Sequence, residues 1–105
     1  MNEELLSIPK VYDREYQFCL ILWAHEPVSS KELVSLCRDQ LGWKPTTTYT
    51  VIKRLAERGV LQNENSVITS LVSKQAVQAY EIQELVHNRF DGSMSAFAET
   101  FKQMQ

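Results

Sequence analysis

Apolar side chains recur at the intervals of a helix in three successive stretches of the first sixty residues. The first predicted helix begins at Asp13, its expected N-cap, and ends at Glu26, because the residue before Pro27 is pushed out of the helical region. Its apolar stripe contains Tyr16, Cys19, Leu20 and Trp23, and is widened by Phe18, Ile21 and Leu22. We therefore expect this helix to be largely buried.

The second predicted helix begins at Ser29, which has a capping-box spacing to Glu32, and it ends near Gly42. A third predicted helix begins at Pro45 and ends at Gly59. It divides into two stripes along its length. The apolar stripe contains Thr48, Val51, Ile52 and Leu55, and the opposite stripe contains Thr46, Thr47, Thr50, Lys53, Arg54 and Glu57. Since three successive threonines are poor helix formers, packing or function must hold them there.

The rest of the pattern predicts a two-stranded β-hairpin followed by two helices. Residues 60–61 and 67–72 favour strands, and the turn-like residues 63–66 lie between them. Ser73 is placed to cap a long helix that closes at residues 91–92, and Ser93 to start a short last one. One face of that last helix is strongly apolar, with Met94, Phe97, Ala98, Phe101 and Met104. Residues 1–10 are predicted to form a loose tail, and the fold class to be mostly α with a small β-hairpin.

Composition excludes several classes of protein. A chain of 105 residues fits one domain with a short appended arm. It has no apolar run near the roughly 18 residues of a membrane span and no signal-peptide core, so we expect a cytoplasmic protein. Two cysteines without metal-ligand spacing exclude a disulfide framework.

Charge is distributed unevenly, although the net charge is only −2. Residues 31–58 hold six basic and three acidic side chains, whereas the rest of the chain holds five basic and ten acidic ones. A basic middle in an acidic protein indicates a local anionic partner. A chance cluster on two solvated helices accounts for the charge equally well.

The sequence contains no constellation typical of an enzyme. His25 and His87 are isolated from other ligand-type residues, and we interpret both as surface or packing residues. Cys19 and Cys37 lie on apolar helix faces, which predicts inert buried thiols. No glycine-rich phosphate loop and no nucleophile–base order is present, so we predict no catalysis, no metal and no cofactor.

The predicted order of elements is that of a winged helix-turn-helix. A third helix whose outer face carries threonines and arginine fits a DNA major groove, where hydroxyls meet phosphates or base edges. Lysine and arginine neutralise phosphates, which contributes most of the affinity. Two alternatives stay open: a three-helix core with an accidentally polar face, and a winged helix that binds a protein instead of DNA.

Two well-separated motifs give the chain a family resemblance. The first contains Trp43, Thr47, Thr50, Arg54, Leu55, Arg58, Gly59 and Leu61, and the second is Asn88-Arg89-Phe90-Asp91-Gly92. Together with Leu22-Trp23, they make residues 12–102 similar to the BlaI/MecI/CopY family of penicillinase and copper-operon repressors.

The resemblance implies a homodimeric winged-helix repressor that binds a dyad-symmetric operator of double-stranded DNA. It implies a DNA-binding domain over residues 1–73 and a helical dimerisation arm over residues 74–105. The implied DNA contacts are Thr46, Thr47, Thr50 and Arg54. Lys53 is added only because it lies on the same side of the predicted helix. The arm agrees with an apolar stripe that a monomer does not easily cover, formed by Met94, Phe97, Phe101 and Met104.

Three features of the chain depart from the family pattern. The hairpin lacks the usual Gly-Arg turn and has no basic residue between Leu61 and Ser73, so it is not counted among the DNA contacts. No Cys-x-Cys pair lies near the C-terminus, which argues against copper sensing. The family's Asn-Phe cleavage position reads Thr100-Phe101, so a protease switch has no support and no upstream sensor is identified.

Overall fold

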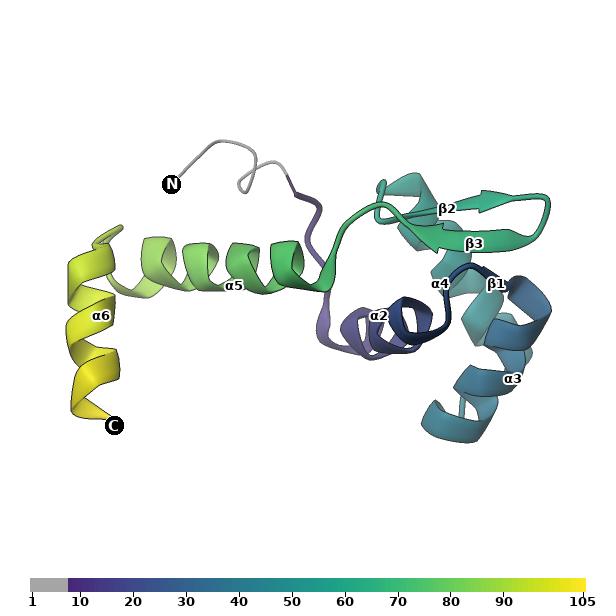
Figure 1. Ribbon diagram of the computed structural model, residues 1–105, viewed down its shortest axis with the longest axis horizontal. Helices are drawn as coiled ribbons and strands as arrows, with labels where there is room; N and C mark the ends of the chain where they lie inside the picture. The colour runs from purple at the N-terminus through teal and green to yellow at the C-terminus, as the bar shows by residue number, and fades with distance from the viewer. Residues whose placement is uncertain (1–7) are drawn as a thin grey trace. The chain divides into compact units, whose positions relative to one another are not determined.

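A computed structural model describes residues 8–105, so most of the predicted N-terminal tail lies outside the described residues. The chain divides into two compact units, and Pro9–Lys74 forms the first. Its elements are α2 (Asp13–His25), β1 (Val28–Ser29), α3 (Ser30–Leu41), α4 (Pro45–Glu57), β2 (Leu61–Glu64) and β3 (Val67–Ser70) (Figure 1). This unit is mostly helical with a small antiparallel sheet, and its elements follow the predicted winged helix-turn-helix arrangement.

The start of α2 and its buried face both differ from the prediction. Tyr12, not Asp13, is the N-cap: its backbone is extended, and its N–H donates to the Glu15 carboxylate at 3.0 Å. The buried face contains Glu15, Phe18, Cys19, Ile21 and Leu22, whereas Leu20 is exposed. The apolar stripe was placed wrongly because this helix is apolar on several sides, and the pairing of Glu15 with a cation brings a charged residue inside.

The predicted ends of α3 and α4 are confirmed. Ser29 Oγ accepts a hydrogen bond from the Glu32 N–H at 3.1 Å, and Gly42 caps α3 in the left-handed region with φ +69°. Pro45 is the first residue of α4, where a missing N–H costs nothing. The predicted apolar stripe of α4 is buried throughout: Thr48, Val51, Ile52 and Leu55.

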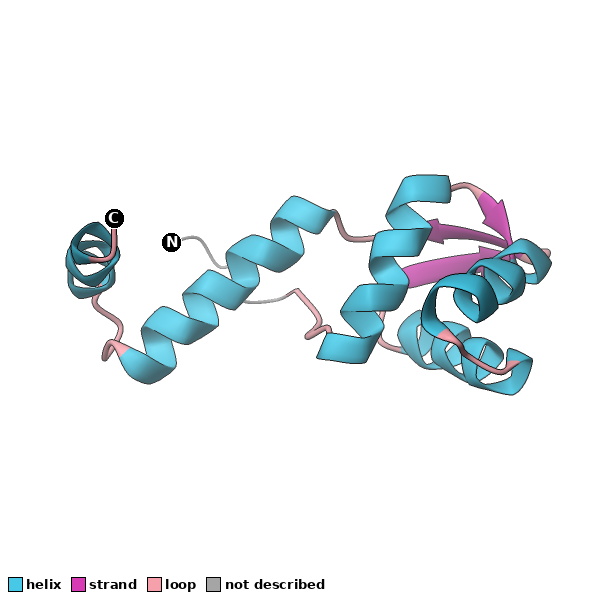
Figure 2. Cartoon of the chain, turned by 90° about the horizontal axis from the view of Figure 1, so that it is seen from below, coloured by secondary structure: helices cyan, strands magenta, loops and turns pink. Residues whose placement is uncertain are grey.

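The sheet has three strands, not the predicted two, in the order β1-β3-β2 (Figure 2). β1 pairs antiparallel with β3 through Val28↔Ile68, and β2 pairs with β3 from Leu61↔Ser70 to Glu64↔Val67. A strand of two residues is too short to give an alternating pattern, which is why the sequence did not reveal it. The turn between β2 and β3 is also shorter than predicted.

That turn consists of Asn65 and Ser66 alone, because Asn63 and Glu64 belong to β2. Both turn residues have positive φ, 53° and 66°, as a two-residue hairpin of the right-handed twist requires. The Asn63 Oδ1 atom accepts from the Ser66 N–H at 3.0 Å. The hairpin end is therefore fixed by one side chain and two left-handed residues.

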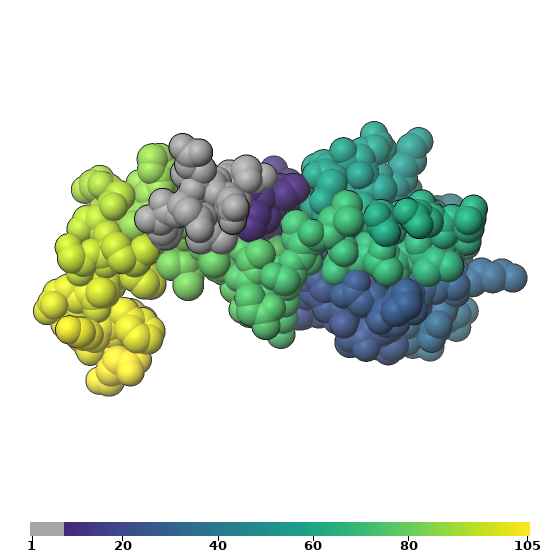
Figure 3. Space-filling view, turned by 45° about the horizontal axis from the view of Figure 1, so that its top comes forward, coloured from purple at the N-terminus to yellow at the C-terminus, as the bar shows by residue number. Residues whose placement is uncertain are grey.

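Side chains from every element of the first unit form its core. The largest fully buried ones are Phe18, Leu22, Leu33, Leu55, Leu61 and Ile68. Polar contacts join the end of α2 to β3 and the residues after it: Trp23 Nε1 donates to the Val72 carbonyl at 3.0 Å, and the carboxylate of the C-cap residue Glu26 accepts from the Ser70 N–H at 2.7 Å. In the space-filling view β3 lies against the segment after α2, as its pairing with β1 requires (Figure 3).

The second unit contains α5 (Lys74–Arg89), apart from its first residue, and α6 (Met94–Gln103). Asp91 and Gly92 join the two helices in the left-handed region, and Ser93 Oγ caps α6 by accepting from the Ala96 N–H at 3.1 Å, as predicted. No residue of α6 is buried: Met104 is 77% and Phe101 53% exposed. Within residues 8–105, no helix is long and apolar enough to cross a membrane.

Candidate nucleic-acid interface

The five predicted DNA-contact residues lie together on the outer face of α4. Thr46, Thr50, Lys53 and Arg54 are exposed and Thr47 is half-buried. We call these five residues the α4 face. Whether they touch DNA stays a prediction.

The core holds the α4 face in a fixed orientation. The opposite side of α4 is anchored by Leu55 and Ile52, which are 0% and 3% exposed. At its C-terminal end the Val60 N–H donates to the Leu55 carbonyl at 2.9 Å, and Gly59, with φ +81°, lets the chain turn into β2. The three successive threonines are thus held in a helix by packing of one of them, Thr48, which is fully buried.

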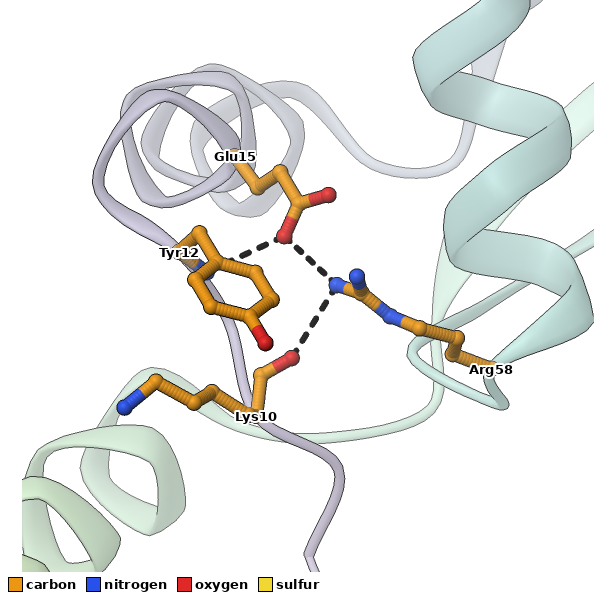
Figure 4. A network of polar contacts seen from close by, with 4 residues as sticks. All are labelled: Lys10, Tyr12, Glu15 and Arg58. Atoms are coloured by element: carbon orange, nitrogen blue, oxygen red, sulfur yellow. Dashed lines mark hydrogen bonds and ion pairs between the residues drawn. The ribbon is translucent and has the colours of Figure 1, made fainter.

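Arg58 belongs to the basic segment by sequence but is used inside the protein (Figure 4). Its guanidinium donates to the Glu15 carboxylate and, at 3.0 Å, to the Lys10 carbonyl. It also lies 5.4 Å from the centre of the Tyr12 ring. Arg58 therefore joins the end of α4 to the start of α2, and the count of charges overstated what is available to an external anion.

The other basic side chains of residues 31–58 are on the surface. Arg38 pairs with its exposed neighbour Asp39 at 3.3 Å. The rest form no ion pair with any residue between 8 and 105: Lys31, Lys44, Lys53 and Arg54. Lys53 and Arg54 lie on the α4 face itself. Exposed cations without an internal partner are what a phosphate backbone needs.

A hollow of about 290 Å³ lies between α2 and the α4 face. Its lining consists of Arg14, Glu15, Trp43, Thr46, Thr47, Thr50, Val51 and Arg54. The Arg14 guanidinium lies over the Trp43 ring, 5.4 Å from its centre. Arg14 was missed by the sequence reasoning because it precedes α4 by about thirty residues, and no spacing rule connects the two helices.

Tyr49 is a second residue that the sequence reasoning missed. Its side chain is 47% exposed at the edge of the α4 face, one helical turn before Lys53. It belonged to neither predicted stripe, because its position on the helical wheel falls between them. An exposed tyrosine offers an apolar ring and a hydroxyl, both of which suit a nucleic acid groove.

The hairpin differs from α4 in charge. Residues 61–73 contain one charged side chain, Glu64, and it is exposed in β2. The remaining tip residues are neutral and polar: Gln62, Asn63, Asn65 and Ser66. The hairpin thus presents no cation to a phosphate backbone.

The thiols predicted to be buried are buried. Burial, reinforced by the Glu15 carboxylate, raises the pKa of the Cys19 thiol to about 12. Burial also raises the pKa of Cys37. Of the histidines, His25 is exposed with its Nδ1 2.8 Å from the Ile21 carbonyl, and His87 is exposed on α5. Among the described residues, no three His, Cys, Asp or Glu side chains gather as a metal site would need.

Comparisons with known proteins agree with this geometry. The curated penicillinase repressor of Bacillus licheniformis is 19% identical over 99 residues, which cover 90% of this chain and 77% of that protein. The solution structure of the Bacillus licheniformis BlaI monomeric form in complex with the blaP half-operator is similar, with a TM-score of 0.56 and 25% identity over 66% of this chain and 89% of that one. The family model described as penicillinase repressor matches residues 12–105. The resemblance found in the sequence is confirmed: the chain belongs to the penicillinase repressor family.

Proposed function

We propose that this protein is a DNA-binding transcriptional repressor that inserts α4 into the major groove of its operator. The observation that carries the proposal is the α4 face, which combines three threonine hydroxyls with two cations that have no ion-pair partner among residues 8–105. The similar BlaI structure holds a half-operator, which supports DNA as the partner. Repression in this form requires neither catalysis nor a cofactor, and it places the protein in the cytoplasm with the DNA.

The residues of the α4 face have different roles in the proposal. Arg54 and Thr47 reach base edges or the phosphates beside them, because guanidinium and hydroxyl groups match acceptors of the major groove. Thr46 and Thr50 flank them, so their hydroxyls and methyls meet phosphates and thymine. Lys53, at the edge of the face, neutralises a phosphate and adds affinity without sequence preference.

The proposed repressor is a homodimer. The dimerisation arm, residues 74–105, carries the apolar stripe of Met94, Phe97, Phe101 and Met104 on α6, none of which is buried. An isolated helix of ten residues has only marginal stability in water. In the proposed dimer, the apolar stripe of α6 packs against the same stripe of a second copy across a two-fold axis. With one DNA-binding domain (residues 1–73) per copy, the operator is a pair of inverted half-sites.

Selection from a random duplex library tests the function and identifies the operator in the same experiment. The protein is expected to enrich a palindromic sequence. In a gel-shift assay it should bind this duplex at lower protein concentration than a scrambled duplex of equal composition. A triple variant of the α4 face, T47A/T50A/R54A, is the matched control and is expected to enrich nothing. If the wild type enriches no sequence and shifts no duplex, the proposal is wrong.

A further inference from the structure

The hollow between α2 and the α4 face has a composition that the proposed reading of bases does not explain. Its lining combines Arg14 from α2 with Arg54 and the hydroxyl-bearing Thr46, Thr47 and Thr50 from α4. Threonine and arginine from α4 belong to the proposed DNA contacts. Arg14 comes from α2, and its guanidinium lies over the Trp43 ring.

Trp43 provides a rigid platform for Arg14. Its side chain is 6% exposed, and its ring stacks on the Phe18 ring with a centroid distance of 6.2 Å and an interplanar angle of 1°. A guanidinium held over a fixed aromatic ring contacts the ring with its flat face. Its N–H donors lie along the edge of the guanidinium and stay available for an anion. Arg14 is exposed and forms no ion pair with any residue between 8 and 105.

The acidic member of the lining does not cancel this charge. The Glu15 carboxylate accepts hydrogen bonds from Arg58 and from the Tyr12 N–H (Figure 4). Its charge is thus compensated from the side of the core. The lining consequently holds two guanidinium groups, Arg14 and Arg54, beside one carboxylate that already pairs with Arg58.

We propose that Arg14 is a DNA contact made from α2, and that with Arg54 it binds one phosphate of the operator backbone over the hollow. Two guanidinium groups and neighbouring hydroxyls match the oxygens of a phosphodiester, and guanidinium–phosphate contacts are favoured by their fork geometry. This inference rests on the proposed function, since it takes α4 as the element in the groove. A contact from α2 fixes the register of α4 along the strand without reading sequence.

Binding to a random-sequence duplex of 30 base pairs tests the inference, because phosphate contacts do not require the operator. Fluorescence anisotropy is measured over a range of salt for the wild type, R14A, R14K and K74A. Lys74 is the matched control, an exposed cation outside the lining of the hollow. R14A is expected to bind about tenfold more weakly at low salt, and its slope of log affinity against log salt is expected to fall by about 0.9 for each phosphate that is no longer neutralised.

R14K is expected to recover the salt slope and part of the affinity, since it restores the charge but not the fork. K74A is expected to change neither, and the thermal unfolding of R14A is expected to match the wild type. The same loss is expected on the selected operator, since a phosphate contact strengthens binding to all sequences alike. One contrary result is that R14A keeps the duplex affinity and salt slope of the wild type, or loses no more affinity than K74A. This result would show that Arg14 does not contact DNA and would leave the repressor function standing. If the wild type binds neither duplex, the repressor function fails and this inference fails with it.

Discussion

The two compact units of the chain differ in what they leave on their surfaces. Residues 9–74 enclose a core of large apolar side chains, among them Phe18, Leu22 and Leu55, and expose hydroxyls and cations on the α4 face. In the other unit, α6 buries none of its residues and exposes Met94, Phe101 and Met104. One unit therefore has a complete core and a surface suited to an anion, and the other has an apolar surface that water does not solvate well.

This difference separates the two parts of the proposed function. The α4 face contributes charge and hydrogen bonds, which are sensitive to salt and to single polar substitutions. The α6 stripe contributes apolar area, which is insensitive to salt and is disrupted when charge is introduced. Substitutions in the two regions should therefore give different patterns of loss.

The largest effect is expected from charge in the α6 stripe. In F97D/F101D, two aspartates per copy would be buried without partners, so the dimer should dissociate and operator binding should be abolished at micromolar protein. Sedimentation equilibrium of wild type and variant measures this, and E99Q, an exposed change in the same helix, is the control. A wild type that is monomeric at tens of micromolar would remove this interface.

A large loss of stability is expected from Arg58→Ala in the first unit. The Glu15 side chain, which is 8% exposed beside Arg58, would lose its cation while staying largely inside the protein, so the free energy of unfolding should fall by about 2 kcal/mol. The matched control is Arg38→Ala, whose partner Asp39 is on the surface and whose loss should cost less than about 0.5 kcal/mol. Urea unfolding compares the two, and equal losses would contradict the structural role of Arg58.

Substitutions in the α4 face should lower the affinity for the operator without changing the free energy of unfolding. Arg54→Ala and Thr47→Val are each expected to weaken operator binding by about 1–3 kcal/mol, through the loss of a base or phosphate contact. Their unfolding free energies should stay within about 0.5 kcal/mol of the wild type, because both side chains lie outside the core. Anisotropy and urea curves on the same samples decide this, with Gln62→Ala in the hairpin as the control. Normal operator binding by either variant would remove that residue from the interface.

The smallest effect is expected from Glu64→Lys, which gives the hairpin its first cation. Because β2 contacts α4, a cation in the hairpin is expected to add a weak attraction to DNA bound by the α4 face, screened over about 10 Å at 0.1 M salt. Affinity for random duplex should rise a few-fold and the salt slope should become slightly steeper. The matched control is Glu81→Lys on α5, with the same charge change at an exposed site. An equal gain for the two variants would show that only net charge matters.

The sequence predicted α3 and α4 and their ends well, because the determinants of these helices are local. Ser29, Gly42 and Pro45 act within one turn of their own positions, and the apolar stripe of α4 follows from its period alone. The α4 face followed from the same periodicity. The family resemblance was equally readable, since its motifs are short and lie in order along the chain.

The features that the sequence did not reveal depend on contacts between distant residues. β1 exists only because Val28 meets Ile68 across the sheet. Glu15 is buried only because Arg58 reaches it from the end of α4, forty-three residues later. Arg14 joins the candidate interface only through the packing of α2 beside α4. None of these pairings has a spacing that a period of two or 3.6 residues detects.

Methylation protection of the selected operator tests the central claim most directly, because dimethyl sulfate modifies guanine N7 in the major groove. If α4 of two copies enters the groove, the wild type should protect two sets of guanines related by a dyad, about one helical turn (10 base pairs) or a small multiple of it apart. The triple variant T47A/T50A/R54A, at the concentration that saturates the operator with wild type, should leave these guanines unprotected in both half-sites, while the K74A pattern should remain that of the wild type. A single asymmetric window of protection, or a protection pattern unchanged in the triple variant, would contradict the account.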